Sequence, residues 1–393
     1  MLLATLLVID FKKTVIHKFV WWIMAFFVAF LLSSVILNPF RTFYINTELS
    51  VIKLPYVVSF SRFMELFCCL IFVHYVCISF RKISIERIMR AVYRLIRFQI
   101  YWIGTFFVFV FCLYRFGILH VAQGNGFLVY DTTFNYSDIP SFRLKGFFVE
   151  GGPLGLFYAY LFVLYDGVLA IMKKKDLLGK AIIILIIYVA QSKAGYACLG
   201  LYLVYHVYSI INRGRYRLML KAVGIPVIAV ITSVFLYFLL ISYLSVLSDD
   251  IRKSDPNDVN GAMDMGRVPA MIIVPNMVKK NYLLGIGLGN YPLLRNDPDY
   301  LGFFKAIPTS LWDSPGLGGL IDLLNEGGII FFATFALILY IIFMKIKTSK
   351  ILVIVFLSFV LPFVSGVQLY FIYPWFSLAL IIILLREKEL TYE

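Results

Sequence analysis

The chain has 393 residues and a net charge of +14; 61% of its residues are hydrophobic and only 15% are charged. A soluble domain carries about 25% charged residues, and a water-soluble fold could not bury this much apolar surface. The composition therefore predicts an all-α polytopic membrane protein, with residues 1–393 forming a single transmembrane domain.

Apolar runs along the chain predict about ten transmembrane helices. The single runs lie at 19–37, 54–80, 98–119, 147–172, 222–244 and 317–344. Two longer runs, 177–211 and 351–385, exceed the roughly 20 residues of one span, so each predicts a pair of helices. We expect the pairs to turn at Gln191-Ser192-Lys193 and near 366–370.

The basic residues predict how these spans are oriented. Arg87, Arg90, Arg94 and Arg97 follow one another at helical spacing, which is typical of a basic amphipathic helix on an anionic membrane surface. Outside the long loop, most Lys and Arg residues fall on the side that holds both chain ends. The positive-inside rule then predicts cytoplasmic termini, a small periplasmic loop at 121–146 and a large periplasmic loop with short helices at 245–316. This distribution argues against a nucleic-acid partner.

Two cations, a carboxylate and a helix-breaking Gly-Gly-Pro stand together before the fourth span. Arg143 and Lys145 precede it, and we expect Glu150 to lie within its first turn. Gly151-Gly152-Pro153 would bend the helix start and expose backbone amides. Arg and Lys at such a position commonly anchor a helix, but a carboxylate inside a span is costly and usually functional. Arg115, near the outer end of the third span, could reach the interface or join this group.

Three polar motifs further along the chain carry weaker signals. Lys193, between two short helices, fits a substrate site and a solvated loop equally well. The GxGxG of residues 285–289 lacks the strand and helix of a dinucleotide site, so we interpret it as backbone packing tightly over a site. Asp297-Pro298-Asp299 resembles a metal-binding DxD, but nucleotide sugars are not supplied outside, and we interpret it as a turn.

Five more charged residues, near or within spans, complete the candidates. Asp322 and Glu326 start the eighth span, where carboxylates favour the helix dipole. Asp313 lies in the loop just before and could reach a pocket. Arg62 and Glu65 are three residues apart and can pair on one helix face. The five cysteines all lie in apolar runs, so neither a disulfide framework nor a metal site is predicted.

Several of these motifs resemble one family. RLKGFFVEGGPLG resembles the R-x-x-G-x-F segment of bacterial O-antigen polymerases of the Wzy type, and QSKAGY resembles their S-R/K-A-G turn. The order GR, LLGIGLGNY, LLNEGG resembles signatures shared by these polymerases and O-antigen ligases. The resemblance covers about Ser141 to Phe332.

The resemblance implies a membrane glycosyltransferase of the GT-C type in the bacterial inner membrane. It would join polyprenyl-diphosphate-linked oligosaccharides, as donor and acceptor, on the periplasmic face, with a chain-length regulator protein and membrane lipids as partners. Arg143, Lys193 and Arg267 match the family's basic positions. Ligases carry a His before the eighth span where this chain has Trp312-Asp313-Ser314, and this departure favours a polymerase.

Charge chemistry leads to the same assignment of roles. Breaking the anomeric bond leaves a diphosphate, which cations can neutralise where no metal cluster is visible. We assign this role to a basic set: Arg143, Lys145, Lys193, Arg267 and Arg115. The acceptor hydroxyl needs a base, for which Glu150 is the first choice and Asp313 the second. Inversion at the anomeric carbon is implied by the family. No cofactor is expected.

Three alternative functions stay open. An O-antigen ligase would transfer the glycan to lipid A–core and would need another residue in place of the missing His. A lipid-linked oligosaccharide flippase or other transporter would carry charges along a central path and internal repeats. A scaffold would tolerate neutral substitution of Arg143 and Arg267.

Overall fold

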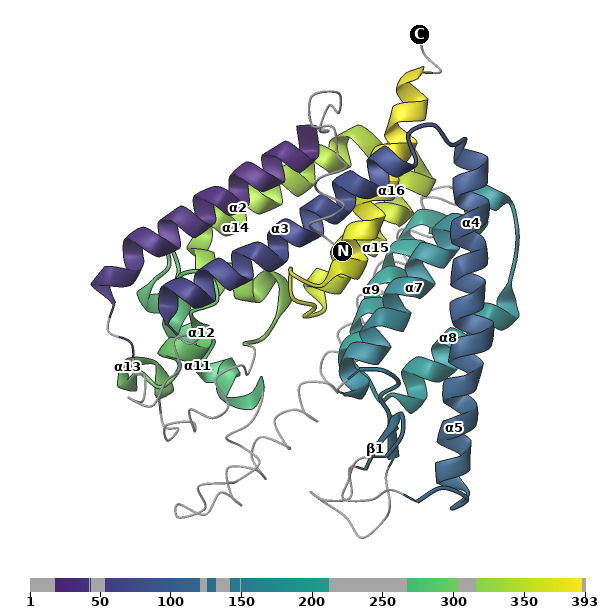
Figure 1. The fold of residues 1–393 in the computed structure, drawn as a ribbon, viewed down its shortest axis with the longest axis horizontal. Helices are drawn as coiled ribbons and strands as arrows, with labels where there is room; N and C mark the ends of the chain where they lie inside the picture. Colours follow the sequence, from purple (N-terminus) through teal and green to yellow (C-terminus); the bar gives the residue numbers. More distant parts are fainter. Residues whose placement is uncertain are drawn as a thin grey trace.

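The structure is a computed structural model that describes residues 18–41, 43, 54–120, 126–131, 142–148, 150–211, 267–302 and 316–390. Within these ranges the chain is mainly helical (Figure 1). The membrane-type helices are α2 (Lys18–Leu37), α3 (Pro55–Ser79), α4 (Ile85–Phe98), α5 (Thr105–Arg115), α7 (Gly151–Met172), α8 (Leu177–Val189), α9 (Lys193–Ile211), α14 (Gly319–Ile346), α15 (Lys350–Val364) and α16 (Ile372–Leu390). The predicted span at 222–244 lies outside the described residues.

Five helical stretches within the described ranges are long and apolar enough to cross a membrane. They are Lys18–Phe40, Pro55–Ser79, Ile85–Arg115, Gly151–Met172 and Gly319–Ile346. Helices α8, α15 and α16 are apolar but shorter over their described lengths. The membrane character and the mainly helical class are thus confirmed, and the count of about ten spans stays a prediction.

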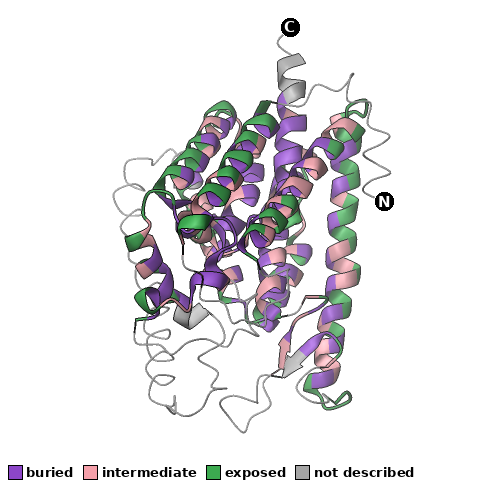
Figure 2. Cartoon of the chain, turned by 60° about the vertical axis from the view of Figure 1, so that its left-hand side comes forward, coloured by how far each residue is buried: buried purple, intermediate pink, exposed green. Residues whose placement is uncertain are grey.

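Helix α7 runs through the centre of the bundle. Most of its residues are buried, whereas the other long apolar helices bury about a third of theirs. Trp375 of α16 is fully buried, donates its Nε1–H to the carbonyl of Leu369 at 2.7 Å, and packs against Phe27 and Phe359. The outer helices carry exposed residues on their outward sides (Figure 2), and many of these are large apolar residues, as expected of surfaces that face lipid.

The basic amphipathic helix and the third span form one continuous helix, Ile85–Arg115, where the sequence predicted two elements. A π-helical turn, Gln99–Gly104, joins α4 to α5. Ile88, Met89, Val92 and Ile96 line the buried side of α4, so its basic stripe faces outward. The predicted amphipathicity was correct, but the run of arginines does not interrupt the helix because only one of its faces is charged.

A small β-hairpin departs from the all-helical pattern. Strand β1 (Val129–Asp131) pairs antiparallel with β2 (Phe142–Leu144), and Tyr130 lies opposite Arg143. The Tyr114 hydroxyl at the end of α5 accepts a hydrogen bond from the Phe127 amide at 2.7 Å. This hydrogen bond holds the segment just before β1 against the end of α5.

The large loop also contains helices, α11 (Arg267–Lys280), α12 (Tyr291–Leu294) and α13 (Pro298–Leu301). These helices and the β-hairpin lie toward one end of the molecule, and the C-terminus lies toward the other (Figure 1). The Asp297 side chain accepts from the Asp299 amide at 2.9 Å, which confirms the predicted turn at Asp-Pro-Asp. The described parts of the two predicted loops, 121–146 and 245–316, thus lie toward the same end of the molecule.

Candidate functional site

Two of the motifs that resemble the family meet at the start of α7. An added Cβ at Gly155 would lie 2.1 Å from the Cβ of Ser192, and one at Gly151 would lie 2.5 Å from the carbonyl oxygen of Ala190. Ser192 Oγ donates to the Gly152 carbonyl at 2.8 Å and accepts from the Gly195 amide at 3.1 Å. Only glycine lets these two backbones approach so closely, so the QSKAG turn lies directly on the EGGPLG segment.

Cationic side chains surround this junction. Arg143, on β2, donates from Nη2 to the Gln191 carbonyl at 3.1 Å, and Lys193 is the exposed first residue of α9. Lys145 follows β2 directly. Helices α7 and α9 both begin here, so their N-terminal amides add partial positive charge. The arrangement suits a phosphate-bearing ligand, because helix N-termini and Arg or Lys side chains both stabilise anions.

Glu150 lies outside α7, which corrects its expected position within the first turn. It is the N-cap residue with extended backbone, its side chain is exposed, and it makes no capping hydrogen bond. Proline at the third helical position is compatible with the first turn, so the helix begins at Gly151. The argument from the cost of a carboxylate in a span therefore no longer applies, although Glu150 stays beside the basic junction.

The structure describes the other predicted site residues only in part. Arg115 is the exposed last residue of α5, next to Tyr114, whose ring packs against Phe142 at the edge of the junction. Arg267 is the first residue of α11, and its side chain lies outside the described atoms. Asp313 also lies outside the described residues. The proposed roles of all seven residues stay predictions.

The glycine-rich loop of residues 282–290 packs on a break in α14. Gly328 has a φ of +65° and interrupts the helix. The carbonyls of Asn325 and Glu326 accept from the amides of Ile286 and Gly287 at 3.0 and 2.7 Å, and the Ile329 amide donates to Tyr282 at 2.7 Å. The loop thus satisfies backbone groups that the break would leave unpaired in a membrane.

Polar side chains from α2 and α3 hold the same loop from the other side. Ser34 Oγ accepts from the Leu288 amide, and Ser59 Oγ donates to the Leu288 carbonyl, both at 2.8 Å. The fully buried Asn290 donates to Asn38 at 2.8 Å. An added Cβ at Gly285 would lie 2.4 Å from the Glu326 carbonyl. The interpretation of the glycines as close packing is confirmed, and the sequence analysis missed the two serines.

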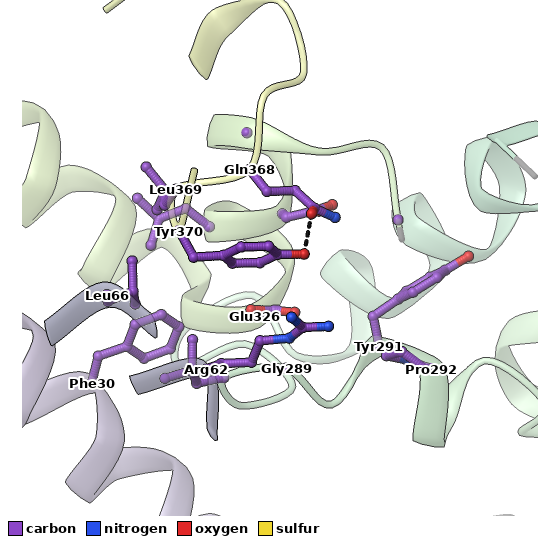
Figure 3. Close-up of a pocket in the computed structure, with 15 residues that line it drawn as sticks. Phe30, Arg62, Leu66, Gly289, Tyr291, Pro292, Glu326, Gln368, Leu369 and Tyr370 are labelled. Carbon is purple, nitrogen blue, oxygen red and sulfur yellow. Dashed lines mark hydrogen bonds between the residues drawn. The ribbon is translucent and has the colours of Figure 1, made fainter. Parts of the chain in front are cut away.

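A pocket lies between this loop, α3, α14 and the turn from α15 to α16 (Figure 3). It encloses about 50 Å³, enough for water molecules or one end of a ligand. Its polar lining comes from Arg62, Tyr291, Asp322, Glu326, Gln368 and Tyr370. The Tyr370 hydroxyl donates a hydrogen bond to Gln368.

Arg62 contributes both to helix packing and to this pocket. Its Nη1 lies 2.9 Å from Glu65 Oε2, which confirms the predicted pair. Its guanidinium also lies 4.5 Å from the Tyr370 ring centre and faces the pocket with Glu326 (Figure 3). The structural interpretation of Arg62 and the helix-dipole interpretation of Glu326 were therefore incomplete. Arg62 on α3 and Glu326 on α14 are far apart in sequence, and no spacing signal could have joined them.

Arg295 in the large loop differs from a typical loop cation, which is solvated. Its side chain is buried beside Tyr291, and desolvation lowers the pKa of its guanidinium. Burial likewise raises the pKa of the Tyr291 hydroxyl. A buried cation behind a pocket-lining tyrosine adds positive potential on the loop side of the pocket.

A second, mostly apolar cavity lies between the basic junction at the start of α7 and the pocket lined by Arg62 and Glu326. It encloses about 130 Å³ between Phe148, Pro153 and Leu156 at the start of α7 and the turn from α15 to α16. Gly316 and Gln368 line both cavities, so the two adjoin. Within the described residues, no group of three or more His, Cys, Asp or Glu side chains could hold a metal ion.

The site therefore has three parts: a basic junction where α7 and α9 begin, an apolar cavity beside it, and a pocket lined by Arg62 and Glu326. Such an arrangement can bind an amphipathic anion and place a carboxylate near it. Comparison with protein families, curated proteins and solved structures finds no match to this chain.

Proposed function

We propose that the protein is a membrane glycosyltransferase that polymerises polyprenyl-diphosphate-linked oligosaccharide repeats on the periplasmic face of a bacterial inner membrane. The observation that supports this most directly is the contact between the EGGPLG and QSKAG motifs. Their contact at Gly155 and Ser192 brings Arg143 and Lys193 to the start of two helices. The repeat units would form O-antigen or a similar surface polysaccharide.

In this proposal, the basic junction binds the diphosphate of the donor. Arg143, Lys145 and Lys193, with the α7 and α9 amides, stabilise the negative charge that grows as the anomeric C–O bond breaks. Arg115 and Arg267 extend the same positive region. The apolar cavity beside Phe148 and Leu156 receives the first part of the lipid tail.

The acceptor sugar hydroxyl attacks the anomeric carbon as polyprenyl diphosphate leaves. A new C–O bond replaces the old one, and the hydroxyl proton passes to a carboxylate. Glu150 keeps its place as the first candidate base and Asp313 as the second, and the pocket adds Glu326 as a third. Attack from the face opposite the leaving group would invert the anomeric configuration, which linkage analysis of the product can test.

A glycan ladder tests the proposal. The gene is deleted and complemented with wild type, Arg143→Ala, Arg267→Ala or Glu150→Gln at matched expression, and the surface polysaccharide is separated on a gel. We expect single repeats on the lipid anchor and loss of the ladder for each variant. Lys175→Ala is the matched control, because Lys175 is an exposed cation beyond the opposite end of α7.

Other ladder patterns would contradict the proposal. Long polymer that accumulates on polyprenyl diphosphate but is absent from lipid A–core would indicate a ligase. Lipid-linked repeats trapped on the inner leaflet would indicate a flippase. A normal ladder from Arg143→Ala and Arg267→Ala together would indicate a scaffold.

Glu326→Gln, compared with Glu150→Gln, distinguishes the candidate bases. Removal of the base should lower the polymerisation rate by about 10²–10⁴-fold while the donor still binds. The measurement is the rate of chain extension in purified membranes with lipid-linked repeats. If neither variant loses more than about tenfold in rate, both carboxylates are excluded as the base and Asp313 is left as the candidate.

A further inference from the structure

A third cavity, with a cationic lining, lies on the Ile85–Arg115 helix. It encloses about 240 Å³ and is lined by Tyr93, Arg94, Arg97, Phe98, Tyr101 and Trp102. All six residues come from the end of α4 and the π-helical turn that follows. The proposed glycosyl transfer does not use any of them.

Two cations line this cavity and a third lies beside it. Arg94 and Arg97 are exposed lining residues, and Lys174, in the turn between α7 and α8, lies against the ring of Tyr93, which also lines the cavity. The Lys174 ammonium lies 4.6 Å from the Tyr93 ring centre, and the Arg97 guanidinium lies 5.0 Å from that of Tyr101. Stacking on aromatic rings holds flexible cations in place while their donors stay available for a ligand.

The one carboxylate at this place, Asp176, is occupied by other donors. Tyr101 and Tyr165 donate to it at 2.6 Å each, and the Gly179 amide donates at 2.8 Å, whereas Arg97 Nε lies 4.0 Å away. Asp176 therefore orients the tyrosines that hold Arg97, and it neutralises only part of the positive charge. The cavity keeps a net positive character that suits an anion.

The surroundings of the cavity are those of a lipid–water interface. Leu95, Phe98 and Trp102 are exposed apolar side chains around the cations, and aromatic residues next to Arg typify the interfacial zone. The π-helical turn, a geometry frequent at functional sites, contains both Tyr101 and Trp102. A water-soluble phosphate would gain nothing from these apolar contacts, whereas a phospholipid would bury acyl chain on them.

We propose that this cavity binds the headgroup of an anionic phospholipid. Arg94, Arg97 and Lys174 contact the phosphodiester, and Phe98 and Trp102 contact the upper acyl chain. Asp176 lies just beyond the C-terminal end of α7 and Glu150 at its N-terminal end. Since 22 residues of helix separate them, about 33 Å at 1.5 Å per residue, the lipid site lies on the membrane face opposite the basic junction.

Native mass spectrometry of the full chain in neutral detergent tests this proposal. Dioleoyl phosphatidylglycerol, dioleoyl phosphatidylcholine and polyprenyl diphosphate are titrated separately, and the affinity for the first bound lipid is measured. We expect tighter binding of phosphatidylglycerol than of phosphatidylcholine, and a loss of roughly fivefold for each positive charge removed in Arg94→Gln and Arg94→Gln/Lys174→Gln. Both residues are exposed, and an unchanged unfolding midpoint checks that the variants fold.

Lys82→Gln/Arg87→Gln is the matched control, because it removes two exposed charges that lie outside the cavity and more than one helical turn before its first residue, Tyr93. Its affinity should stay within about twofold of wild type at 0.15 M salt, where interactions beyond about 8 Å are screened. An equal loss in this control would show diffuse attraction and overturn the site. Equal affinity for the two phospholipids would overturn it as well, as would Arg94-dependent binding of polyprenyl diphosphate alone.

Discussion

Gly155 sets how closely α7 approaches the turn between α8 and α9. The site of its missing side chain is already filled by Ser192, whose hydroxyl bridges Gly152 and Gly195. The position of Arg143 depends on the same contact, because its guanidinium donates to the carbonyl of Gln191 in that turn. A methyl group added at Gly155 would therefore move the turn that holds Arg143 and carries Lys193, two cations that are far apart in sequence.

Gly155→Ala should destabilise the protein by about 1–3 kcal/mol, since one extra methyl forces backbone to shift in a close-packed contact. The unfolding midpoint in detergent measures the effect. Gly152→Ala is the control, because an added Cβ there meets nothing within 4 Å. Equal destabilisation of the two variants would show that helix flexibility, and not the contact with Ser192, determines the cost.

Asp176 is the second residue for which the effect of a substitution on stability can be predicted. Desolvation would raise its pKa, but hydrogen bonds from Tyr101, Tyr165 and Gly179 together hold the pKa below the ordinary value of 3.8. The charged form is thus favoured in the folded protein. Asp176→Asn should cost about 1–3 kcal/mol at neutral pH, the range of a hydrogen bond to a charged group.

This cost should depend on pH in a defined direction. A lowered folded pKa gives stability that is fully present above the unfolded pKa and is lost as pH falls through the folded value. The difference between wild type and Asp176→Asn should therefore stay constant from pH 7 to about pH 4 and narrow below it. Asp299→Asn, which breaks an exposed pair with Lys280, should change stability by less than about 1 kcal/mol.

At the scale of elements, the break in α14 connects the large loop to the membrane body. The helix loses its regular bonds at Gly328, and residues 282–287 take over the freed groups. An added Cβ at Gly328 would lie 2.4 Å from the backbone of Leu283. The loop and the helix therefore fit together only while this position has no side chain.

Gly328→Ala should detach the loop from α14. Its positive φ and the backbone clash together should cost on the order of 3 kcal/mol or more. Limited proteolysis within residues 282–290 should become faster, and the glycan ladder should be lost. Gly200→Ala, at an open position in α9, is the control, and equal protease resistance of the two variants would contradict the assigned role of the break.

The helices and the turns at 191–193 and 366–370 could be predicted from sequence because each depends on a local run of apolar residues and a local interruption. The continuity of Ile85–Arg115 could not, since a charged stripe looks like a break until its buried face is known. The pocket shared by Arg62 and Glu326 also escaped prediction, because it depends on how α3, α14 and the glycine-rich loop pack. The fourth span was predicted to begin at residue 147, but α7 begins at Gly151, so Glu150 lies before the helix and not within it.

At the scale of the whole molecule, the two charged regions lie at opposite ends of α7. The basic junction lies at Gly151, and the cluster around Asp176 follows Met172. Helix α14 starts beside the apolar cavity, near the N-terminal end of α7. Its C-terminal end, with Lys347, therefore lies toward the C-terminal end of α7. A bilayer about 30 Å thick would separate the two.

Cysteine labelling tests this arrangement in a chain whose five cysteines are replaced by serine. Phe147→Cys, beside the start of α7, should react with a membrane-impermeant maleimide in intact cells with a permeable outer membrane. Lys347→Cys should react only in inverted vesicles. Labelling of both from one side would show that α7 and α14 do not span the bilayer as described, and the reverse pattern would place the site in the cytoplasm.

The attachment of residues 282–287 to α14 has a consequence for how such a protein can evolve. The loop is held through peptide groups of Asn325, Glu326 and Ile329, and any residue without a steric conflict supplies the same peptide groups. The exposed side chains of this loop, Tyr282, Leu283 and Leu284, are thus free to vary, while Gly285 and Gly328 are not. Homologues should therefore diverge at these exposed positions and still keep the spacing of the glycines.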